Sequence, residues 1–267
     1  MSEPKKIPIL SLKGGTGKTT LCIGIAQVLR DMSKKVGLLD VDVHASALPM
    51  ALHLEKPPGY EPLLGGKLRP IQFDGFQIFS VGLLFKEKEV NMWDGQMKSE
   101  AIRQIASSAI DWDEDLEWIV VDTPPTSGDE IQSLIGDGEK IKPSLQNIYG
   151  AVIICQPNDL AVLALAKTLT VLIVTETPIA GVIANMAGYE CPHCGFVSNP
   201  FDRPSEDVRT LAESFGVRFL GQVPFTKPEA RQPAIKEIVE SILRNKPITL
   251  KEKKGGLLRW SLGKALK

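Results

Sequence analysis

The sequence predicts an α/β fold in which a doubly wound, mostly parallel sheet carries helices on both faces. Apolar runs of strand length alternate with helical patterns along the whole chain. Several of these runs are continuously apolar, as is typical of parallel strands that are covered on both faces. A glycine-rich loop also lies between the first expected strand and the first expected helix. In such folds ligands bind at the carboxyl ends of the strands.

The expected elements follow one another in a regular order. Strands are expected at residues 7–12, 36–40, 76–81, 118–122, 151–155, 179–185 and 217–223. Helices are expected at residues 18–32, 98–110, 158–170, 204–215 and 228–243. No internal repeat or low-complexity linker interrupts the series. We therefore predict one domain over residues 1–245, which includes a cysteine motif described below, and a separate tail over residues 246–267.

The composition excludes several classes of protein. The chain has 267 residues, of which 43% are hydrophobic, so it can bury a substantial core. Its net charge of −1 gives no electrostatic reason to expect a nucleic-acid partner. No run approaches the roughly 20 apolar residues of a membrane span. Its 4 cysteines come without a secretion signal, which indicates reduced thiols and a cytoplasmic location.

Residues 10–20 read LSLKGGTGKTT and predict a nucleoside triphosphate site. The glycines leave room for backbone N–H groups to surround phosphate oxygens at a helix N-terminus. Lys18 supplies a positive charge for the terminal phosphates, and the Thr19 hydroxyl can join the ligands of Mg²⁺. The residues expected to bind ATP here are Gly14, Gly15, Thr16, Gly17, Lys18, Thr19 and Thr20.

Three aspartates stand at the ends of expected strands. Asp40 and Asp42 end one strand, and Asp122 ends another. A single aspartate at such a place often caps the next helix. Three of them in a chain with a phosphate loop indicate instead carboxylates that hold Mg²⁺ and orient an attacking water. Thr19, Asp40 and Asp122 are the expected magnesium ligands.

The run Cys191-Pro192-His193-Cys194 allows three interpretations: a redox dithiol, half of a zinc site, or half of an iron–sulfur site. Both metal sites need about four sulfur ligands, and this pair supplies half of them. Cys22 and Cys155 stand where buried packing residues are expected. A second copy of the chain would complete either metal site, because a two-fold interface brings the same residues together.

The segment KGGTGKTT resembles the deviant Walker A signature of the MinD/ParA/Mrp class of P-loop ATPases. The resemblance implies that Lys13 reaches across a dimer interface to the partner's nucleotide, while Lys18 acts on the nucleotide of its own chain. Asp42 matches the switch I aspartate that positions or activates water. Asp122 matches the switch II residue that holds Mg²⁺. The catalytic residues implied are Lys13, Lys18, Asp42 and Asp122.

The Asn-Met segment that leads into the cysteine pair narrows the resemblance. Over roughly residues 5–245 the chain is similar to the Mrp/ApbC iron–sulfur cluster carriers. The resemblance implies a homodimer that holds one labile [4Fe–4S] cluster at Cys191 and Cys194 and delivers it to apo-proteins. ATP binding or hydrolysis would be coupled to loading or release. Asn185 matches an adenine contact, and Pro224 lies in the matching adenine-side loop.

Two segments depart from the family pattern. After Pro124 and Pro125 the expected glycine comes late, at Gly128, which predicts slow or differently regulated hydrolysis. Residues 43–46 read VHAS where relatives tend to carry Gly-Pro-Ser.

Two rival functions are open. The tail contains a short basic amphipathic segment with Trp260, for which a solvated tail, a partner-binding element and a membrane-surface element are open interpretations. Membrane binding through this segment would point to a MinD-like positioning ATPase, in which the cysteine pair would have no evident use. A nucleotide-gated scaffold bridged by Zn²⁺ is the other alternative.

Overall fold

The computed structural model describes residues 3–43, 46–54, 67–84, 94–107, 109–125, 129–191, 193–201 and 203–251. The chain divides into two compact units. Unit 1 comprises residues 1–9 and 19–148, and unit 2 comprises residues 10–18 and 149–267. The unit boundaries therefore cut through the glycine-rich loop region, so that Lys18 and Thr19 belong to different units.

The sheet of unit 1 is built from parallel strands with one antiparallel edge strand. Its order is β1 (Lys5–Leu10), β5 (Trp118–Asp122), β2 (Val36–Asp40), β4 (Phe76–Ser80) and β3 (Ile71–Phe73), and β3 runs antiparallel to β4. Every residue of β2, β4 and β5 is buried. This explains the continuously apolar runs, because both faces of these strands are covered. The register sets Asp40 opposite Asp122 on one side and Ser80 on the other.

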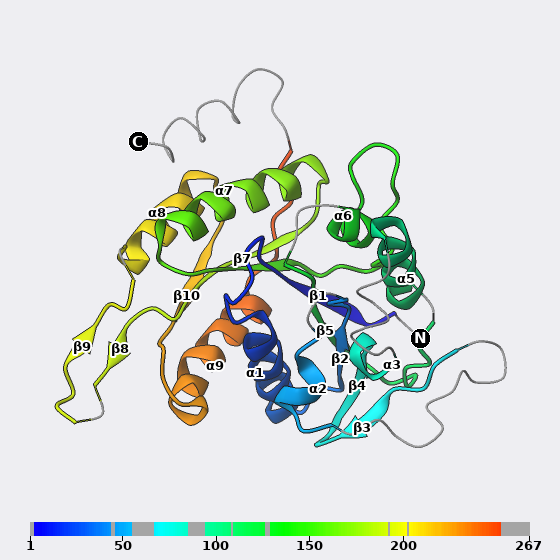
Figure 1. Ribbon diagram of the computed structural model, residues 1–267, viewed down its shortest axis with the longest axis horizontal. Coiled ribbons are helices and arrows are strands. Elements are labelled where there is room, and N and C mark those ends of the chain that lie inside the picture. The colour runs from blue at the N-terminus through cyan, green and yellow to red at the C-terminus, as the bar shows by residue number, and fades with distance from the viewer. Residues whose placement is uncertain are drawn as a thin grey trace. The chain divides into compact units, whose positions relative to one another are not determined.

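Helices cover both faces of this sheet. Helix α1 (Lys18–Asp31) lies on one face, while α5 (Gly95–Ser107) and α6 (Asp129–Ile135) pack together on the opposite face (Figure 1). The short helices α2 (Leu48–Ala51) and α3 (Val81–Leu84) follow β2 and β4.

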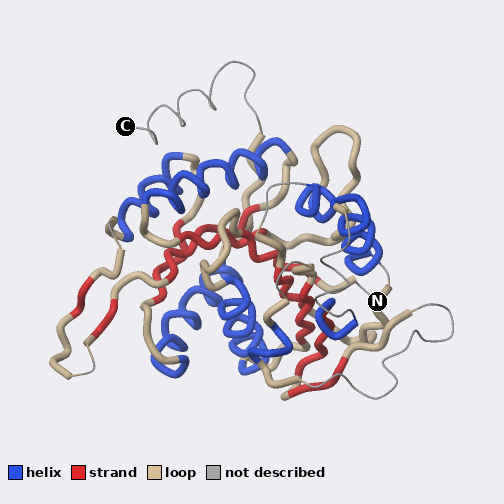
Figure 2. The backbone as a smooth tube through the Cα atoms, in the orientation of Figure 1, coloured by secondary structure: helices blue, strands red, loops and turns tan. Residues whose placement is uncertain are grey.

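Unit 2 contains a second set of parallel strands, in the order β10 (Phe219–Val223), β7 (Ile179–Asn185) and β6 (Ala151–Cys155). Helices α7 (Asp159–Val174) and α8 (Ser205–Ser214) lie on one face, and α9 (Pro228–Arg244) lies on the other (Figure 2). After α9, Ile248 pairs with Ile179 at the start of β7.

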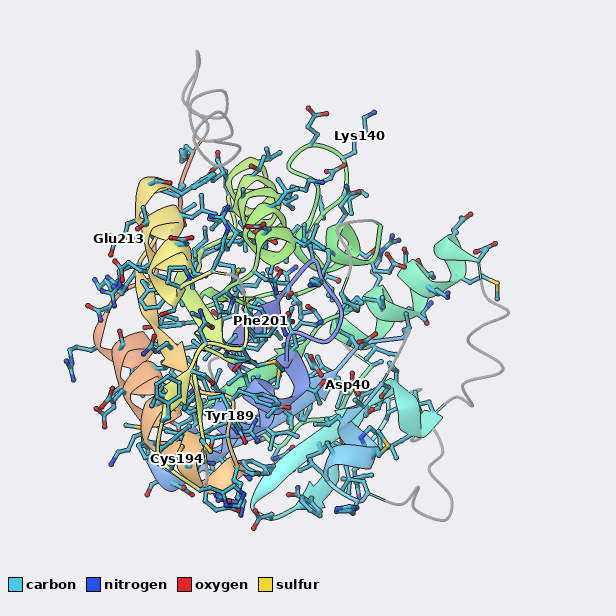
Figure 3. The ribbon with its side chains drawn as sticks, turned by 60° about the vertical axis from the view of Figure 1, so that its left-hand side comes forward. Asp40, Lys140, Tyr189, Cys194, Phe201 and Glu213 are labelled. Carbon is cyan, nitrogen blue, oxygen red and sulfur yellow. The ribbon has the colours of Figure 1, made fainter. Side chains whose placement is uncertain are left out.

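A short hairpin projects from unit 2. Its strands are β8 (Tyr189–Glu190) and β9 (Val197–Ser198), which pair antiparallel, and the cysteine pair lies between them (Figure 1). Figure 3 shows Cys194 at the end of this hairpin that is farthest from β7.

The strand and helix predictions are confirmed, with small shifts at the ends. The first strand ends at Leu10 rather than residue 12, because Ser11 and Lys13 exchange hydrogen bonds and begin the loop. Some elements were not predicted, and most of these are too short to show a period: α2, α3, α6, β3, β8 and β9. Among the described residues no helix is long and apolar enough to cross a membrane. The basic tail from residue 252 lies outside the described residues.

Candidate nucleotide and cysteine sites

The phosphate loop is shaped by its own polar groups. Ser11 Oγ donates to the Lys13 carbonyl at 3.1 Å and accepts from the Lys13 N–H at 3.3 Å. Gly15 and Gly17 adopt φ values of 72° and 87°, which side chains other than glycine rarely tolerate. Helix α1 begins directly afterwards at Lys18. The loop therefore precedes a helix N-terminus, where unpaired N–H groups favour anions.

Two amide side chains of unit 2 donate hydrogen bonds to carbonyl groups of this loop. Asn185 Nδ2 donates to the Thr16 carbonyl at 2.7 Å, and Gln156 Nε2 donates to the Gly15 carbonyl at 3.1 Å. A Cβ on Gly17 would lie 2.3 Å from Asn185 Nδ2, so a side chain at this position would displace the Asn185 amide from the loop.

Asn185 was expected to contact adenine, and that contact stays a prediction, since a carboxamide has a further donor and acceptor beyond the bond to Thr16. Gln156 was not predicted. Its position directly after the expected strand 151–155 was the signal that could have identified it.

In unit 1 the predicted aspartates come together at the ends of β2 and β5. Asp40 is fully buried, and Asp122 and Asp42 are nearly so. Thr19 Oγ1 donates to Asp122 Oδ2 at 2.5 Å, and the Asp42 N–H donates to Asp40 Oδ1 at 2.9 Å. Ser46 and Ser80 were not predicted, yet both hydroxyls donate to Asp40 Oδ2, at 2.5 and 2.7 Å.

This acidic cluster fits a magnesium ion. Burial, together with the nearby charge of Asp122, raises the pKa of Asp40 to about 7. A divalent cation would favour the ionised form of both carboxylates, and oxygen donors are the ligands that Mg²⁺ prefers. Thr19, Asp40 and Asp122 are the residues that would hold it, and the ion would supply positive charge to the phosphates of a nucleotide.

The two cysteines of the hairpin differ in exposure and are not bonded to each other. Cys191 is half-buried, Cys194 is exposed, and neither is in a disulfide. The backbone N–H groups of His193 and Cys194, together with the Cys194 thiol, lower the pKa of Cys191 by hydrogen bonding to its sulfur. Donors aimed at a sulfur favour its thiolate, which is the form that binds metals.

The surroundings of the pair disfavour the redox interpretation. The cysteines lie between two strands, whereas a thioredoxin-like pair would stand at the start of a helix. Two apolar residues that follow the pair on the hairpin, Phe196 and Val197, are 68% and 65% exposed to solvent. Within the described ranges, no third His, Cys, Asp or Glu side chain joins the cysteine pair in a group that could hold a metal.

The remaining predicted residues are placed as follows. Cys22 and Cys155 are buried, as expected, and burial raises the pKa of Cys155 to about 12. Lys18 is buried and Lys13 is half-buried. Pro224 follows β10, in a loop where the Phe225 N–H donates to the Gly188 carbonyl at 2.8 Å. The late glycine of switch II, at residue 128, and residues 44 and 45 lie outside the described residues.

With this geometry established, comparison with known proteins identifies the family. The family model of the NUBPL iron-transfer P-loop NTPases, within ParA, matches residues 3–251. The chain belongs to this family. The resemblance to cluster-carrying P-loop ATPases is thereby confirmed.

Two relatives of this chain are similar to it over most of their own length. The iron-sulfur cluster carrier protein of Methanocaldococcus jannaschii is 37% identical over 228 residues, which cover 84% of this chain and 74% of the relative. The cytosolic Fe-S cluster assembly factor NUBP2 of Rattus norvegicus is 35% identical over 225 residues, which cover 82% of this chain and 78% of the relative.

Solved structures confirm the predicted fold class. A nucleotide-binding protein of Archaeoglobus fulgidus in complex with ADP matches with a TM-score of 0.65 at 24% identity, covering 87% of each chain. The septum site-determining protein MinD of Pyrococcus horikoshii, complexed with Mg-ADP, matches with a TM-score of 0.61 at 19% identity. That match covers 90% of this chain and 96% of MinD. The fold is that of a P-loop NTPase of the MinD/ParA type.

Proposed function

We propose that this chain is an ATP-hydrolysing iron–sulfur cluster carrier. It holds a labile [4Fe–4S] cluster between two copies of itself and transfers the cluster to apo-proteins in the cytoplasm. The observation that carries the proposal is the Cys191–Cys194 pair, in which neither thiol is in a disulfide, Cys194 is exposed, and two backbone N–H groups lower the pKa of Cys191. The archaeal relative is named a cluster carrier and the rat relative a cytosolic assembly factor, and both names support the proposal.

The ligand count explains why two copies are required. A [4Fe–4S] cluster is normally held by about four thiolates, and one chain brings Cys191 and Cys194. A two-fold axis beside the hairpin would bring the same pair from a second copy. A cluster held by two thiolates from each chain at an exposed hairpin can be released by a modest change in the contact between chains.

The nucleotide chemistry would also depend on the dimer. Lys18 and the loop N–H groups would bind the phosphates of ATP, and Asp42 would orient the attacking water. Lys13 would reach the nucleotide of the partner chain and stabilise charge that develops in phosphoryl transfer. Hydrolysis would then occur only in the dimer.

Anaerobic reconstitution with ferrous iron and sulfide tests the cargo. The wild type should gain a broad visible charge-transfer absorption and about four iron atoms per two chains. Cys191→Ser should lose both. Cys22→Ala is the matched control, because it also removes one thiol, but a buried one in α1, and it should retain the cluster.

Three results would contradict the proposal. One is a wild type that binds no iron, and another is a complete cluster on a monomer. The third is zinc, found by elemental analysis of protein purified without air, at the same two cysteines.

The loaded dimer should also activate an apo form of a [4Fe–4S] enzyme faster than free iron and sulfide do.

A further inference from the structure

The first arm of the cysteine hairpin begins at the end of β7, where a side chain is hydrogen-bonded to the phosphate loop. Asn185 ends β7 and donates to the Thr16 carbonyl at 2.7 Å. The next residue, Met186, has a positive φ of 59°, and its Sδ accepts from Gln156 Nε2 at 3.1 Å. β8 begins at Tyr189, after two further residues. The first arm is therefore fixed to the loop within four residues of its start.

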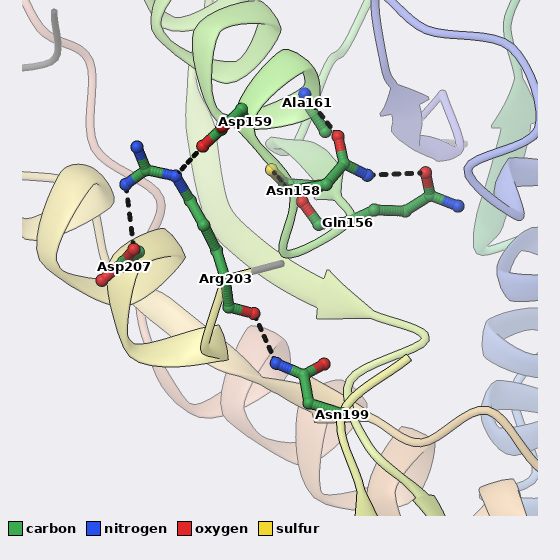
Figure 4. A network of polar contacts seen from close by, with 8 residues as sticks. Gln156, Asn158, Asp159, Ala161, Asn199, Arg203 and Asp207 are labelled. Carbon is green, nitrogen blue, oxygen red and sulfur yellow. Dashed lines mark hydrogen bonds and ion pairs between the residues drawn. The ribbon is translucent and has the colours of Figure 1, made fainter. Parts of the chain in front are cut away.

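The returning arm is fixed through Arg203. Directly after β9, Asn199 Nδ2 donates to the Arg203 carbonyl at 2.6 Å (Figure 4). The Arg203 N–H donates to the Pro157 carbonyl at 3.2 Å. Its guanidinium pairs with Asp159 in the first turn of α7 and with Asp207 in α8, the latter at 3.0 Å. Arg203 thus ties the end of the hairpin to the segment that follows β6.

That segment leads back to the phosphate loop. Asn158 Nδ2 donates to Gln156 Oε1 at 3.3 Å, and Gln156 Nε2 donates to the Gly15 carbonyl at 3.1 Å (Figure 4 shows the first of these bonds). All of these groups belong to unit 2. A continuous series of hydrogen bonds and short chain segments therefore joins the loop to both arms of the hairpin.

The peptide groups involved are those that a phosphate would move. A peptide unit is planar, so its carbonyl and its N–H turn together. Gln156 holds the carbonyl of the Gly15–Thr16 unit, and Asn185 holds that of the Thr16–Gly17 unit. The N–H groups of the same two units belong to the glycine-rich loop, whose backbone N–H groups surround phosphate in a P-loop. A bound phosphate would therefore act on the two amide side chains that begin both routes to the hairpin.

We propose that the Gln156–Asn158–Arg203 network couples nucleotide binding at the phosphate loop to the conformation of the cysteine hairpin. Arg203 and Asn158 are positioning residues in this scheme, because they contact neither nucleotide nor cargo. The inference rests on the proposed nucleotide binding, but it does not require that the cargo be an iron–sulfur cluster.

The test follows the thiols of the cluster-free full chain. Iodoacetamide alkylation of Cys191 and Cys194 is timed by peptide mass spectrometry under anaerobic conditions, without nucleotide and with a saturating non-hydrolysable ATP analogue and Mg²⁺. In the wild type the nucleotide should change the alkylation rate by about fivefold, a typical allosteric coupling. Cys22 and Cys155 should react slowly in every sample, since both are buried.

Two variants interrupt the network at different points. Arg203→Ala removes the guanidinium link to Asp159 and Asp207, so that only the backbone bonds of residue 203 to Pro157 and Asn199 remain. Asn158→Asp loses the amide that donates to Gln156 and keeps an oxygen for the N–H of Ala161, so α7 remains capped. In both variants the nucleotide effect should fall below about twofold. The control is Arg209→Ala on α8, which removes an exposed arginine paired with Glu206 and should keep the full effect.

The affinity for a fluorescent ATP analogue is measured on the same samples. If the analogue binds the wild type but leaves the alkylation rate unchanged, the coupling is wrong and the nucleotide proposal stands. If both variants keep the full effect while folded, as judged by thermal melting, the assigned network is wrong. If no nucleotide binds, both the nucleotide part of the proposed function and the coupling are overturned.

Discussion

At the scale of single residues, the acidic cluster buries two neighbouring carboxylates, an arrangement that destabilises the fold unless a cation is bound there. Asp40 and Asp122 face one another in register on neighbouring strands, and both are buried. Apolar side chains at these positions would be more stable in a sheet covered on both faces. Ser46, Ser80 and Thr19 satisfy part of the hydrogen-bonding capacity with hydroxyl groups. The remaining repulsion is what a bound cation would relieve.

Asp40 should therefore make the stability of the metal-free chain depend on pH. Its pKa is about 7 in the folded chain and 3.8 ordinarily, so the folded chain holds this proton more tightly. The free energy of unfolding that Asp40 contributes is present below about pH 4 and is lost as pH rises through 7. The loss is at most roughly 4 kcal/mol. Urea unfolding at pH 5 and pH 8 should show a larger loss for the wild type than for Asp40→Asn.

Magnesium with nucleotide should reduce the wild-type loss, because the cation favours the ionised carboxylate. Parallel pH profiles for the wild type and Asp40→Asn would contradict the assignment.

Gly17 is the loop position that tolerates least change. Gly17→Ala would have to accommodate a Cβ 2.3 Å from Asn185 Nδ2 at a φ of 87°. We expect nucleotide affinity to fall by at least about tenfold, since the loop would lose the shape that surrounds a phosphate. Binding of a fluorescent ATP analogue measures this.

Gly216→Ala is the matched control for the loop variant. Gly216 also has a positive φ, of 74°, but open space around it. Its substitution should cost about 1 kcal/mol of stability and leave affinity unchanged. Equal affinity losses in the two variants would show that general destabilisation, rather than the loop, was responsible.

At the scale of elements, the N-cap residue of α7 belongs to the network that joins the phosphate loop to the cysteine hairpin. Asn158 is its N-cap, in extended conformation, and its Oδ1 accepts from the Ala161 N–H at 2.9 Å. The same side chain donates to Gln156. One residue thus both starts the helix and continues the network described above.

The two roles of Asn158 can be separated by substitution. Asn158→Ala should lower the free energy of unfolding by about 1 kcal/mol, because the first turn of α7 loses its cap. Asn158→Asp should retain most of that stability, since a carboxylate caps as well and lies favourably at a helix N-terminus. Urea denaturation of both variants measures the difference, and equal losses would show that the cap contributes little.

At the scale of the whole molecule, the proposed dimer makes a prediction that no single chain can satisfy. Lys13→Ala and Asp42→Ala should each abolish hydrolysis, because each site needs Asp42 of its own chain and Lys13 of the partner. An equal mixture should recover about a quarter of wild-type activity. Half of the dimers would be mixed, and each of these would contain one intact site out of two.

Steady-state ATP hydrolysis on the separate and mixed variants provides the readout. If Lys13 acted on its own chain's nucleotide, neither chain in the mixture would contain a complete site. Mixtures with no activity would then disprove the trans role of Lys13, even if the wild type is a dimer.

The sequence by itself determined the parts whose chemistry is local. Contiguous residues carry the phosphate loop, and the long strands and helices show clear periods. The ends of those strands carry Asp40, Asp122 and Asn185, and the spacing of Cys191 and Cys194 needs no fold to be seen. The tertiary structure alone decided what faces these groups. Ser80 donates to Asp40, and Gln156 donates to the carbonyl of Gly15. Arg203 pairs with Asp159 at the start of α7. These contacts form because strand register and helix packing bring distant residues together. Such contacts leave no period or spacing in a sequence, since these partners lie from 40 to 141 positions apart along the chain.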